Sequence, residues 1–466
     1  MVCIWCRTQF SVLFIFLWYN NYIIEGCEIM AEIVELEKLE YEKFVKNNKY
    51  KSHFLQSYTW GEFSKKKKKL IPYYIGLKDK NKIVAATLLL EKRLPLGYSY
   101  FYAPRGFVID FSNKNLLKEM STKIIEFIQK KNKKALFLKI DPDIIIKSYN
   151  YLGEENKLPY NYQDIFDNIK ACGFKHLGFT KNFETMQPRY TFRIDMEKSL
   201  DEIENCFSKT TKQRINKAKK LGCEVSIGDI NDIDEFYHLM MLTENRKDFV
   251  SYSKDYYEEQ YNMLEKEDMA VLFLGKVNTK RVIDNLNIEL TDINNSINDI
   301  DPNNTGKNAK NKLKSLNNQK EKILNEIEKY KKYQKKYGQV ITLNAHMIIK
   351  YGDKAWVLYA GNHNILTESY ANYLTYFEHI KYCKENNIKI YDQFGTIGDL
   401  SKDNPRLGLH EFKKKFGGDY VEFIGEFDYV IKPVMYFVFT KLVPLYRKLV
   451  RKKSKMEVNN EVKRDK

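Results

Sequence analysis

The chain has 466 residues, of which 43 % are hydrophobic and 14 % aromatic, and its formal net charge is +17. This composition excludes a largely disordered chain, and the length predicts two or three domains. The charge favours a polyanionic partner (nucleic acid, a phosphate-bearing ligand or an anionic membrane) over a coat of solubilising lysines. The seven cysteines show no ligand spacing beyond a lone Cys3-x-x-Cys6, so they predict reduced thiols in a cytosolic protein and no metal site.

Residues 1–29 form an N-terminal extension whose apolar run, 10–19, is too short to span a bilayer. A signal peptide is one interpretation of this run. A strongly patterned sequence begins at Met30. We therefore favour a second interpretation, in which translation starts at Met30 and the extension is a mis-assigned start.

Strand and helix patterns then follow in an order that occurs twice. The first series has strands over 83–90, 98–109 and 135–140, with a helix over 116–128. The second has strands over 340–349, 355–359 and 388–391, with a helix over 370–383. We predict an α/β (α+β) protein with two domains of one topology, the first over 30–192 and the second over 193–280 and 338–433.

The segment 281–337 interrupts the second domain with two helical heptad series. Apolar residues recur at alternating three- and four-residue spacing on both sides of a Pro/Gly turn at 301–306. This pattern predicts an inserted antiparallel coiled-coil arm. The second helix is densely basic, which fits either a solvated face or a lever for a long anionic partner such as tRNA.

The last segment, 434–466, combines apolar side chains with a basic cluster. Pro433 begins it, and Pro444 is expected to kink it. Such a basic amphipathic tail fits peripheral contact with the inner face of a membrane, although its apolar half could equally pack on the protein's own core.

Four short segments bring together residue types that bind or activate ligands, although the sequence has no P-loop, nucleophile elbow, zinc-protease or dinucleotide motif. The first, 56–65, places Trp60 ahead of Lys65 and four more lysines. The second, 102–106, is a turn with Tyr102 and Arg105. The third, 208–218, begins a helix whose first turn carries Lys212 and Arg214, a good phosphate site. The fourth, 412–418, sets Phe412 and Lys413 ahead of a glycine pair, where a lysine can donate to an oxyanion or to RNA phosphates.

Together these residues resemble the FemABX family of non-ribosomal aminoacyl transferases. The resemblance covers about 31–450 and rests on an ordered series of motifs: Q-S-Y-x-W-G-E-x-x-K, Y-A-P-R-G, I-D-P, Q-P-R-Y, K-x-R-I-N-K-A, E-N-R-x-x-F and F-K-x-x-F-G-G. It implies two acetyltransferase-like (GNAT) domains with an arm like that of a tRNA synthetase. It also implies transfer of Gly, Ala or Ser from aminoacyl-tRNA to the stem peptide of a cell-wall precursor, either lipid II or UDP-MurNAc-pentapeptide, with no metal or organic cofactor.

The same resemblance implies roles for the residues above. Lys65, with Lys212 or Arg214, would hold the precursor's phosphates, and Trp60 would stand beside them. Tyr102 and Arg105 would line the substrate groove, while Phe412 and Lys413 would meet the acyl ester and the tRNA acceptor end. The family helix usually has an arginine where Lys212 stands, so the phosphate contact could have moved to Arg214.

The chemistry itself asks little of the protein, because an aminoacyl ester is already activated. Lys413 is the candidate for stabilising the oxyanion or the leaving group. Asp141 and Asp392, at equivalent strand ends, are candidates for orienting the amine, or else they cap their strands. Two alternatives stay open: an acetyl-CoA-dependent GNAT N-acetyltransferase, and a non-catalytic scaffold that binds RNA or a membrane.

Overall fold

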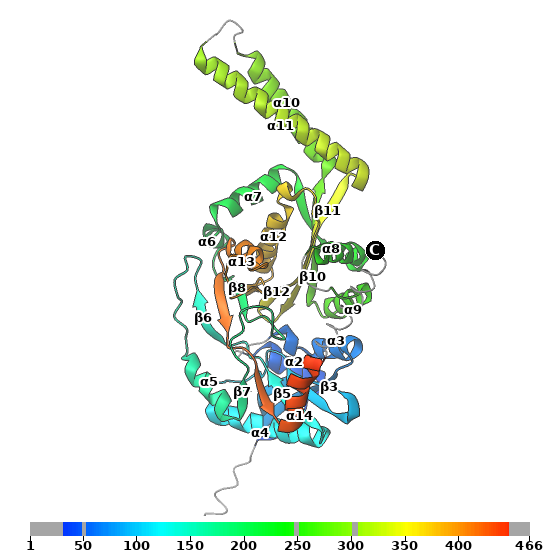
Figure 1. Ribbon diagram of the computed structural model, residues 1–466, viewed down its shortest axis with the longest axis vertical. Coiled ribbons are helices and arrows are strands. Elements are labelled where there is room, and N and C mark those ends of the chain that lie inside the picture. Colours follow the sequence, from blue (N-terminus) through cyan, green and yellow to red (C-terminus); the bar gives the residue numbers. More distant parts are fainter. Residues whose placement is uncertain (1–30, 49–52, 247–250, 301–305, 447–466) are drawn as a thin grey trace, which may run out of the picture.

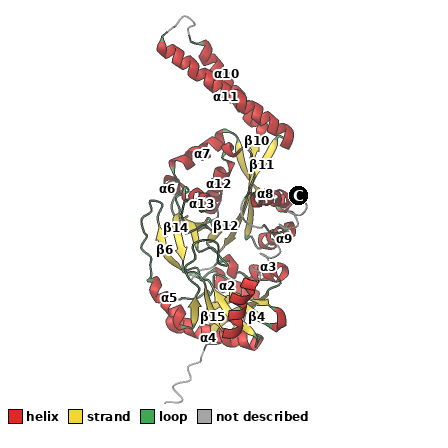
Figure 2. Cartoon of the chain, in the orientation of Figure 1, coloured by secondary structure: helices red, strands yellow, loops and turns green. Residues whose placement is uncertain are grey.

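The computed structural model describes residues 31–48, 53–246, 251–300 and 306–446, which form a body with two β-sheets and a pair of helices that projects from one end (Figure 1). Helices lie against both sheets (Figure 2). The α/β fold class predicted from the sequence is therefore confirmed.

The first sheet has seven strands. In spatial order they are β1 (Glu32–Glu35), β2 (Ile71–Asp79), β3 (Lys82–Arg93), β4 (Ser99–Ala103), β5 (Ala135–Ile140), β15 (Phe427–Val430) and β7 (Phe174–His176). Side chains alternate across β3, so Ala85 and Leu89 pack with one group of helices while Leu88 and Leu90 pack with the other. One group is α4 (Lys114–Lys131) and α5 (Tyr162–Ala171); the other is α2 (Lys38–Lys46), the 3₁₀ turn η1 (Phe54–Gln56) and α3 (Tyr58–Lys68).

The second sheet has eight strands. In spatial order they are β6 (Ile145–Tyr149), β14 (Asp419–Phe423), β8 (Tyr190–Asp195), β13 (Ile390–Asp392), β12 (Lys354–Asn362), β11 (Val340–Tyr351), β10 (Ala270–Asn278) and β9 (Cys223–Gly228). One face packs on α7 (Lys209–Lys220) and α12 (Ala371–Glu385), the other on α8 (Ile233–Glu244) and α9 (Lys254–Glu265). The smaller helices are η3 (Ile230–Asp232), η4 (Thr367–Ser369), α6 (Leu200–Asn205) and α13 (Leu407–Lys414).

The two sheets contain one repeated unit, in agreement with the duplicated pattern of the sequence. Strands β2, β3 and β4 are antiparallel neighbours, and α4 then leads to β5, which lies parallel to β4. Strands β10, β11 and β12 repeat this arrangement, and α12 leads to β13, which lies parallel to β12.

The sheets also exchange strands across the body. β6 precedes residue 192, yet it pairs with β14 in the second sheet. β15 follows residue 338, yet it inserts between β5 and β7 in the first sheet. The chain therefore passes between the sheets four times, from β5 to β6, from β6 to β7, from β7 to β8 and from β14 to β15. The sheets do not divide along the chain at residue 192.

The halves share a hydrophobic core as well. The rings of Phe54 and Trp356 lie 5.1 Å apart, and those of Phe63 and Tyr256 lie 5.0 Å apart, so each contact joins the first half to the second. Because α2 and α3 face α8 and α9 across this shared core, the two halves are one packed body.

The predicted arm corresponds to α10 (Thr279–Asn298) and α11 (Lys307–Tyr337), which lie alongside each other and project from the second sheet (Figure 1). Ile293 of α10 and Ile323, Ile327 and Tyr330 of α11 are buried in the core of this half. The coiled-coil character of the arm stays a prediction.

The described chain ends with α14 (Pro433–Phe437), the π-helical turn η5 (Val438–Leu442) and four more helical residues. Within the described part of the chain, no helix is long and apolar enough to cross a membrane. The basic residues predicted to end the tail, from Arg447 onward, lie outside the described residues.

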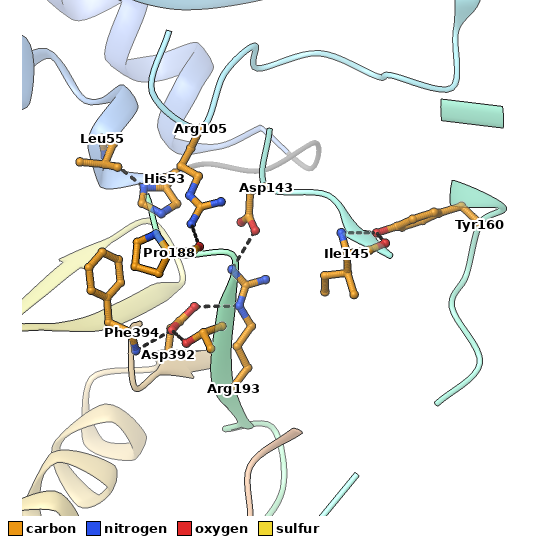
Figure 3. A network of polar contacts seen from close by, with 11 residues as sticks. His53, Leu55, Arg105, Asp143, Ile145, Tyr160, Pro188, Arg193, Asp392 and Phe394 are labelled. Atoms are coloured by element: carbon orange, nitrogen blue, oxygen red, sulfur yellow. Dashed lines mark hydrogen bonds and ion pairs between the residues drawn. The ribbon is translucent and has the colours of Figure 1, made fainter. Parts of the chain in front are cut away.

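A buried arginine joins the places where the chain crosses between halves (Figure 3). Arg193 of β8 pairs with Asp143, in the crossing segment between β5 and β6, and with Asp392 at the end of β13, both at 2.8 Å. The two carboxylates raise the pKa of the Arg193 guanidinium above its ordinary value, against the opposing effect of burial. Removing one partner from such a group leaves buried charge without compensation.

We expect Arg193→Met to lower the free energy of unfolding by about 3–5 kcal/mol, because the buried carboxylates of Asp143 and Asp392 would lose the guanidinium that pairs with both of them. Urea unfolding followed by circular dichroism measures this. Lys331→Met, which removes an exposed pair with Glu328, should cost less than about 0.5 kcal/mol. Equal losses in the two variants would contradict a structural role for Arg193.

Candidate active site

A cavity of about 460 Å³ opens where α3 of the first half meets β12, α13 and the loop after β13 of the second. Its wall is largely aromatic; the rings are Phe54, Trp60, Phe183, Tyr252, Tyr256, Tyr359, Tyr376 and Phe394. Among the described residues, the charged side chains that line it are two lysines, Lys68 and Lys413. The cavity therefore suits a ligand with both apolar and anionic parts.

Lys413, near the end of α13, is only 6 % exposed. Its Nζ donates to the carbonyl oxygens of Phe394 at 2.6 Å and Gly395 at 2.8 Å. Burial lowers the pKa of Lys413 to about 7, and the charge of Asp392 opposes this shift. At neutral pH the amine therefore exists in both protonation states, as an acid–base group requires.

Asp392 holds the loop that Lys413 contacts. Its carboxylate accepts hydrogen bonds from the Phe394 backbone N–H at 2.7 Å and from the Thr191 hydroxyl (Figure 3). Phe394 has a positive φ of 55°, which directs the backbone through a sharp turn. Asp392 thus positions the carbonyls that receive Lys413, and it lines a smaller cavity beside the main one.

Helix α3 brings Trp60 and a lysine into the cavity. The Ser57 hydroxyl caps α3 by accepting from the Trp60 backbone N–H at 3.1 Å. The Nζ of Lys68 lies 4.4 Å from the Trp60 ring centre, and burial lowers the pKa of Lys68 to about 8. Lys65, the residue chosen from the sequence, points away; its side chain is 64 % exposed and lies 3.7 Å from Glu62.

The rest of the lysine run binds another helix. Lys66 pairs with Glu259 and Lys67 with Asp255, each at 2.6 Å, and both acids belong to α9. The run thus fastens α3 of the first half to α9 of the second.

The Tyr102–Arg105 turn forms a separate group around Asp141. The carboxylate of Asp141 accepts from the Tyr102 hydroxyl at 3.0 Å and from the Arg105 backbone N–H at 2.7 Å. Burial raises the pKa of Asp141 to about 7. The Arg105 guanidinium donates to the Pro188 carbonyl at 2.7 Å (Figure 3), in the wall shared by both cavities. Asp141 therefore fixes the turn that carries Arg105.

Lys212 and Arg214 lie on α7, at a distance from the cavity wall. Ser208 caps this helix through the Thr211 backbone N–H at 3.2 Å. Arg214 hydrogen-bonds the Tyr373 hydroxyl and stacks near the same ring. Phe412 packs between Tyr373 and Tyr376, 5.0 Å from each, so a row of rings connects Arg214 to the wall of the cavity.

The structure thus brings Trp60 and Lys413 to one cavity, with Arg105 and Asp392 in the smaller cavity beside it. Tyr102 and Asp141 support Arg105, whereas Lys65, Lys212 and Arg214 lie elsewhere. Sequence reasoning missed Lys68 and the tyrosines of α9 and β12. The run of five lysines, 65–69, indicated that a lysine could lie at the site. Only the contacts with α9 show that Lys68 is the one whose side chain turns inward.

Comparison with known proteins gives consistent matches. The model of the FemAB family matches residues 36–443. A lipid II:glycine glycyltransferase of Staphylococcus aureus (strain MRSA252) is 30 % identical over 444 residues, covering 93 % of this chain and all of the relative. The crystal structure of FemX superimposes with a TM-score of 0.70 at 28 % identity, covering 87 % of this chain and 99 % of FemX. A tandem GNAT protein from clavulanic acid biosynthesis gives a TM-score of 0.43 at 8 % identity, over 85 % of this chain and 98 % of its own.

The lowered pKa of Lys413 predicts how the free energy of unfolding depends on pH. A lysine in an unfolded chain has a pKa of about 10.4, so above about pH 7 the unfolded state binds a proton that the folded state has released. The free energy of unfolding then rises with pH. We expect the difference in free energy of unfolding between wild type and Lys413→Met to move in favour of wild type by about 2 kcal/mol from pH 7 to 9.

Urea titrations of both proteins at several pH values measure this difference. Lys414→Met, at the exposed neighbouring position, should show no such trend. A difference that stays constant with pH would mean that Lys413 keeps an ordinary pKa.

Proposed function

Because the chain belongs to the FemAB family, we propose that it transfers an amino acid of the Gly, Ala or Ser class from aminoacyl-tRNA to the stem peptide of a peptidoglycan precursor. The S. aureus relatives are named for glycyl transfer to lipid II, which supports both the reaction class and the acceptor. The observation that carries the proposal is Lys413, a buried amine of lowered pKa in an aromatic cavity.

The chemistry follows from this environment. The acceptor's neutral amine attacks the carbonyl carbon of the aminoacyl ester. A C–N bond forms, the C=O π bond breaks, and the carbonyl oxygen becomes an oxyanion. When this intermediate collapses, the C–O bond to the tRNA ribose breaks and the departing oxygen needs a proton. Lys413 in its charged form stabilises the developing negative charge and supplies that proton. In its neutral form it then accepts the proton that the attacking nitrogen loses. Lys413 thus returns to its charged form, and the reaction needs no other proton donor or acceptor.

We assign the remaining roles as follows. Phe412 and Lys413 take the acyl ester and the acceptor end of the tRNA. On the α3 side, Lys68 and Trp60 offer a cation and a ring for the precursor's phosphates. The eleven lysines of α11, against three glutamates, make the arm a further surface for tRNA. With a lipid-linked acceptor, the reaction takes place at the inner face of the membrane.

The decisive experiment incubates the protein with a pool of radiolabelled aminoacyl-tRNAs and either lipid II or UDP-MurNAc-pentapeptide, and detects the product by mass. We expect label on the precursor, and its loss after RNase treatment. Lys413→Ala should lower kcat by about 10²–10³-fold, the usual effect of removing one oxyanion donor. Lys414→Ala should stay near wild type. Acetyl transfer from acetyl-CoA, or equal activity in the two variants, would reject the proposal.

The α3 lysines give a second test. We expect Lys68→Gln to raise KM for the precursor by about ten-fold, since a charge-assisted hydrogen bond contributes about 1.5–3 kcal/mol. Lys65→Gln tests the residue predicted from the sequence, and exposed Lys69 supplies the matched control, Lys69→Gln. Steady-state kinetics at fixed aminoacyl-tRNA measure all three. A larger effect at Lys65 than at Lys68 would return the phosphate contact to Lys65.

A further inference from the structure

The last helix of the described chain turns apolar side chains toward solvent. We define the C-terminal stripe as Val434, Phe437, Leu442, Leu445 and Tyr446, whose exposed fractions are 77, 56, 46, 54 and 69 %. Contiguous exposed side chains of this kind mark an interaction surface, whereas scattered single ones need no explanation.

The opposite side of the same helix is anchored to the first sheet. The Tyr436 ring lies 5.3 Å from Phe137 of β5, and its hydroxyl donates to Asp428 at 2.9 Å. The Phe439 ring lies 6.1 Å from Phe137 and 5.8 Å from Tyr100. These contacts fix which side of α14 and η5 packs inward, so the stripe is held outward.

Another exposed apolar side chain, that of Leu96, lies at the end of the sheet where β5 begins. Leu96, in the 3₁₀ turn η2 (Pro95–Gly97), is 82 % exposed, and its carbonyl accepts from the Lys134 Nζ at 3.1 Å. The chain leaves β15 near the start of β5, because the Lys432 backbone N–H donates to the Leu136 carbonyl at 3.0 Å. Leu96 and the start of α14 therefore both lie near the end of the sheet where β5 begins.

The sequence of this segment carries charge of one sign. From Tyr429 to Met456 the sequence contains no aspartate or glutamate and eight cations: Lys432, Lys441, Arg447, Lys448, Arg451, Lys452, Lys453 and Lys455. A peripheral membrane-binding segment needs an apolar face to enter the headgroup region and cations to meet anionic lipid.

We propose that the C-terminal stripe, together with the cations Lys432 and Lys441 of the same segment, docks on an anionic phospholipid surface. RNA would use the cations but has no need of exposed aliphatic side chains. A second copy of the chain would bring the same positive charge against itself. The inference rests on the proposed function for its purpose, since a docked enzyme would meet a lipid-linked acceptor, but the docking can be measured separately.

The test is sedimentation of the full chain with vesicles of phosphatidylcholine alone and of phosphatidylcholine with about one third phosphatidylglycerol. We expect binding to the anionic vesicles only. The triple variant Phe437→Ser/Leu442→Ser/Leu445→Ser should lower the partition coefficient roughly ten-fold or more, and Lys432→Gln/Lys441→Gln should lower it by several-fold. Ile227→Ser, at another exposed apolar position on β9, is the matched control and should bind like wild type.

Two controls on the triple variant separate docking from folding. Thermal unfolding with the wild-type midpoint shows that the variant is folded, and retained transfer to the soluble UDP-linked acceptor shows that only docking is lost. Absence of transfer in wild type would reject the proposed function and leave the vesicle result intact. The docking proposal is overturned by triple-variant binding equal to wild type, or by wild-type binding to phosphatidylcholine equal to that on anionic vesicles. A self-association that the triple variant abolishes, with no vesicle binding, would also overturn it and assign the stripe to a second copy.

Discussion

The ion pairs of Arg193 connect the fold to the candidate chemistry. Asp143 is buried because the chain crosses there from the first sheet to the second, and a buried carboxylate needs a cation. Arg193 supplies it and pairs at the same time with Asp392. Asp392 in turn holds the Phe394–Gly395 loop, whose carbonyls receive Lys413. The position of the amine in the cavity therefore depends on an ion pair at the seam between the halves.

This arrangement explains how the pKa of Lys413 can lie near neutral pH although no acid is among the described residues that line its cavity. A carboxylate beside Lys413 would keep the amine charged, whereas the two carbonyls hold it in place with neutral acceptors. The negative charge that does act on it, that of Asp392, opposes only part of the shift caused by burial. Burial thus lowers the pKa of Lys413, the charge of Asp392 opposes part of this shift, and the hydrogen bonds to the loop set the orientation of the amine.

The sequence predicted the regular elements well because their signals are local. The helix expected over 116–128 lies inside α4, and the strand over 135–140 coincides with β5. In the second unit the strand over 340–349 lies inside β11, and the helix over 370–383 begins one residue before α12. The strand exchange of β6 and β15 was not predicted, because the sequence of a strand of four or five residues does not show which sheet it joins. Lys68 was missed for a related reason: four neighbouring lysines are chemically alike, and only the acids of α9 decide which of them pair and which turns inward. Lys413 was found because a lysine between phenylalanines and before a glycine pair is unusual, but its pKa depends on burial that the sequence does not show.

The net charge of +17 is distributed unevenly, and this distribution bears on how two polyanionic substrates could be handled at once. Some cations are used inside the body: Lys66 and Lys67 join α3 to α9, and Lys139 pairs with Glu426 and Asp428. The excess gathers on α11 and along the chain after β15. The arm and α14 lie toward opposite ends of the molecule, and α3, β12 and α13 lie between them (Figure 1). These three elements line the cavity. On the proposed function, tRNA and a lipid-linked precursor would each be attracted to its own basic surface, so neither would displace the other while their reactive ends meet at Lys413.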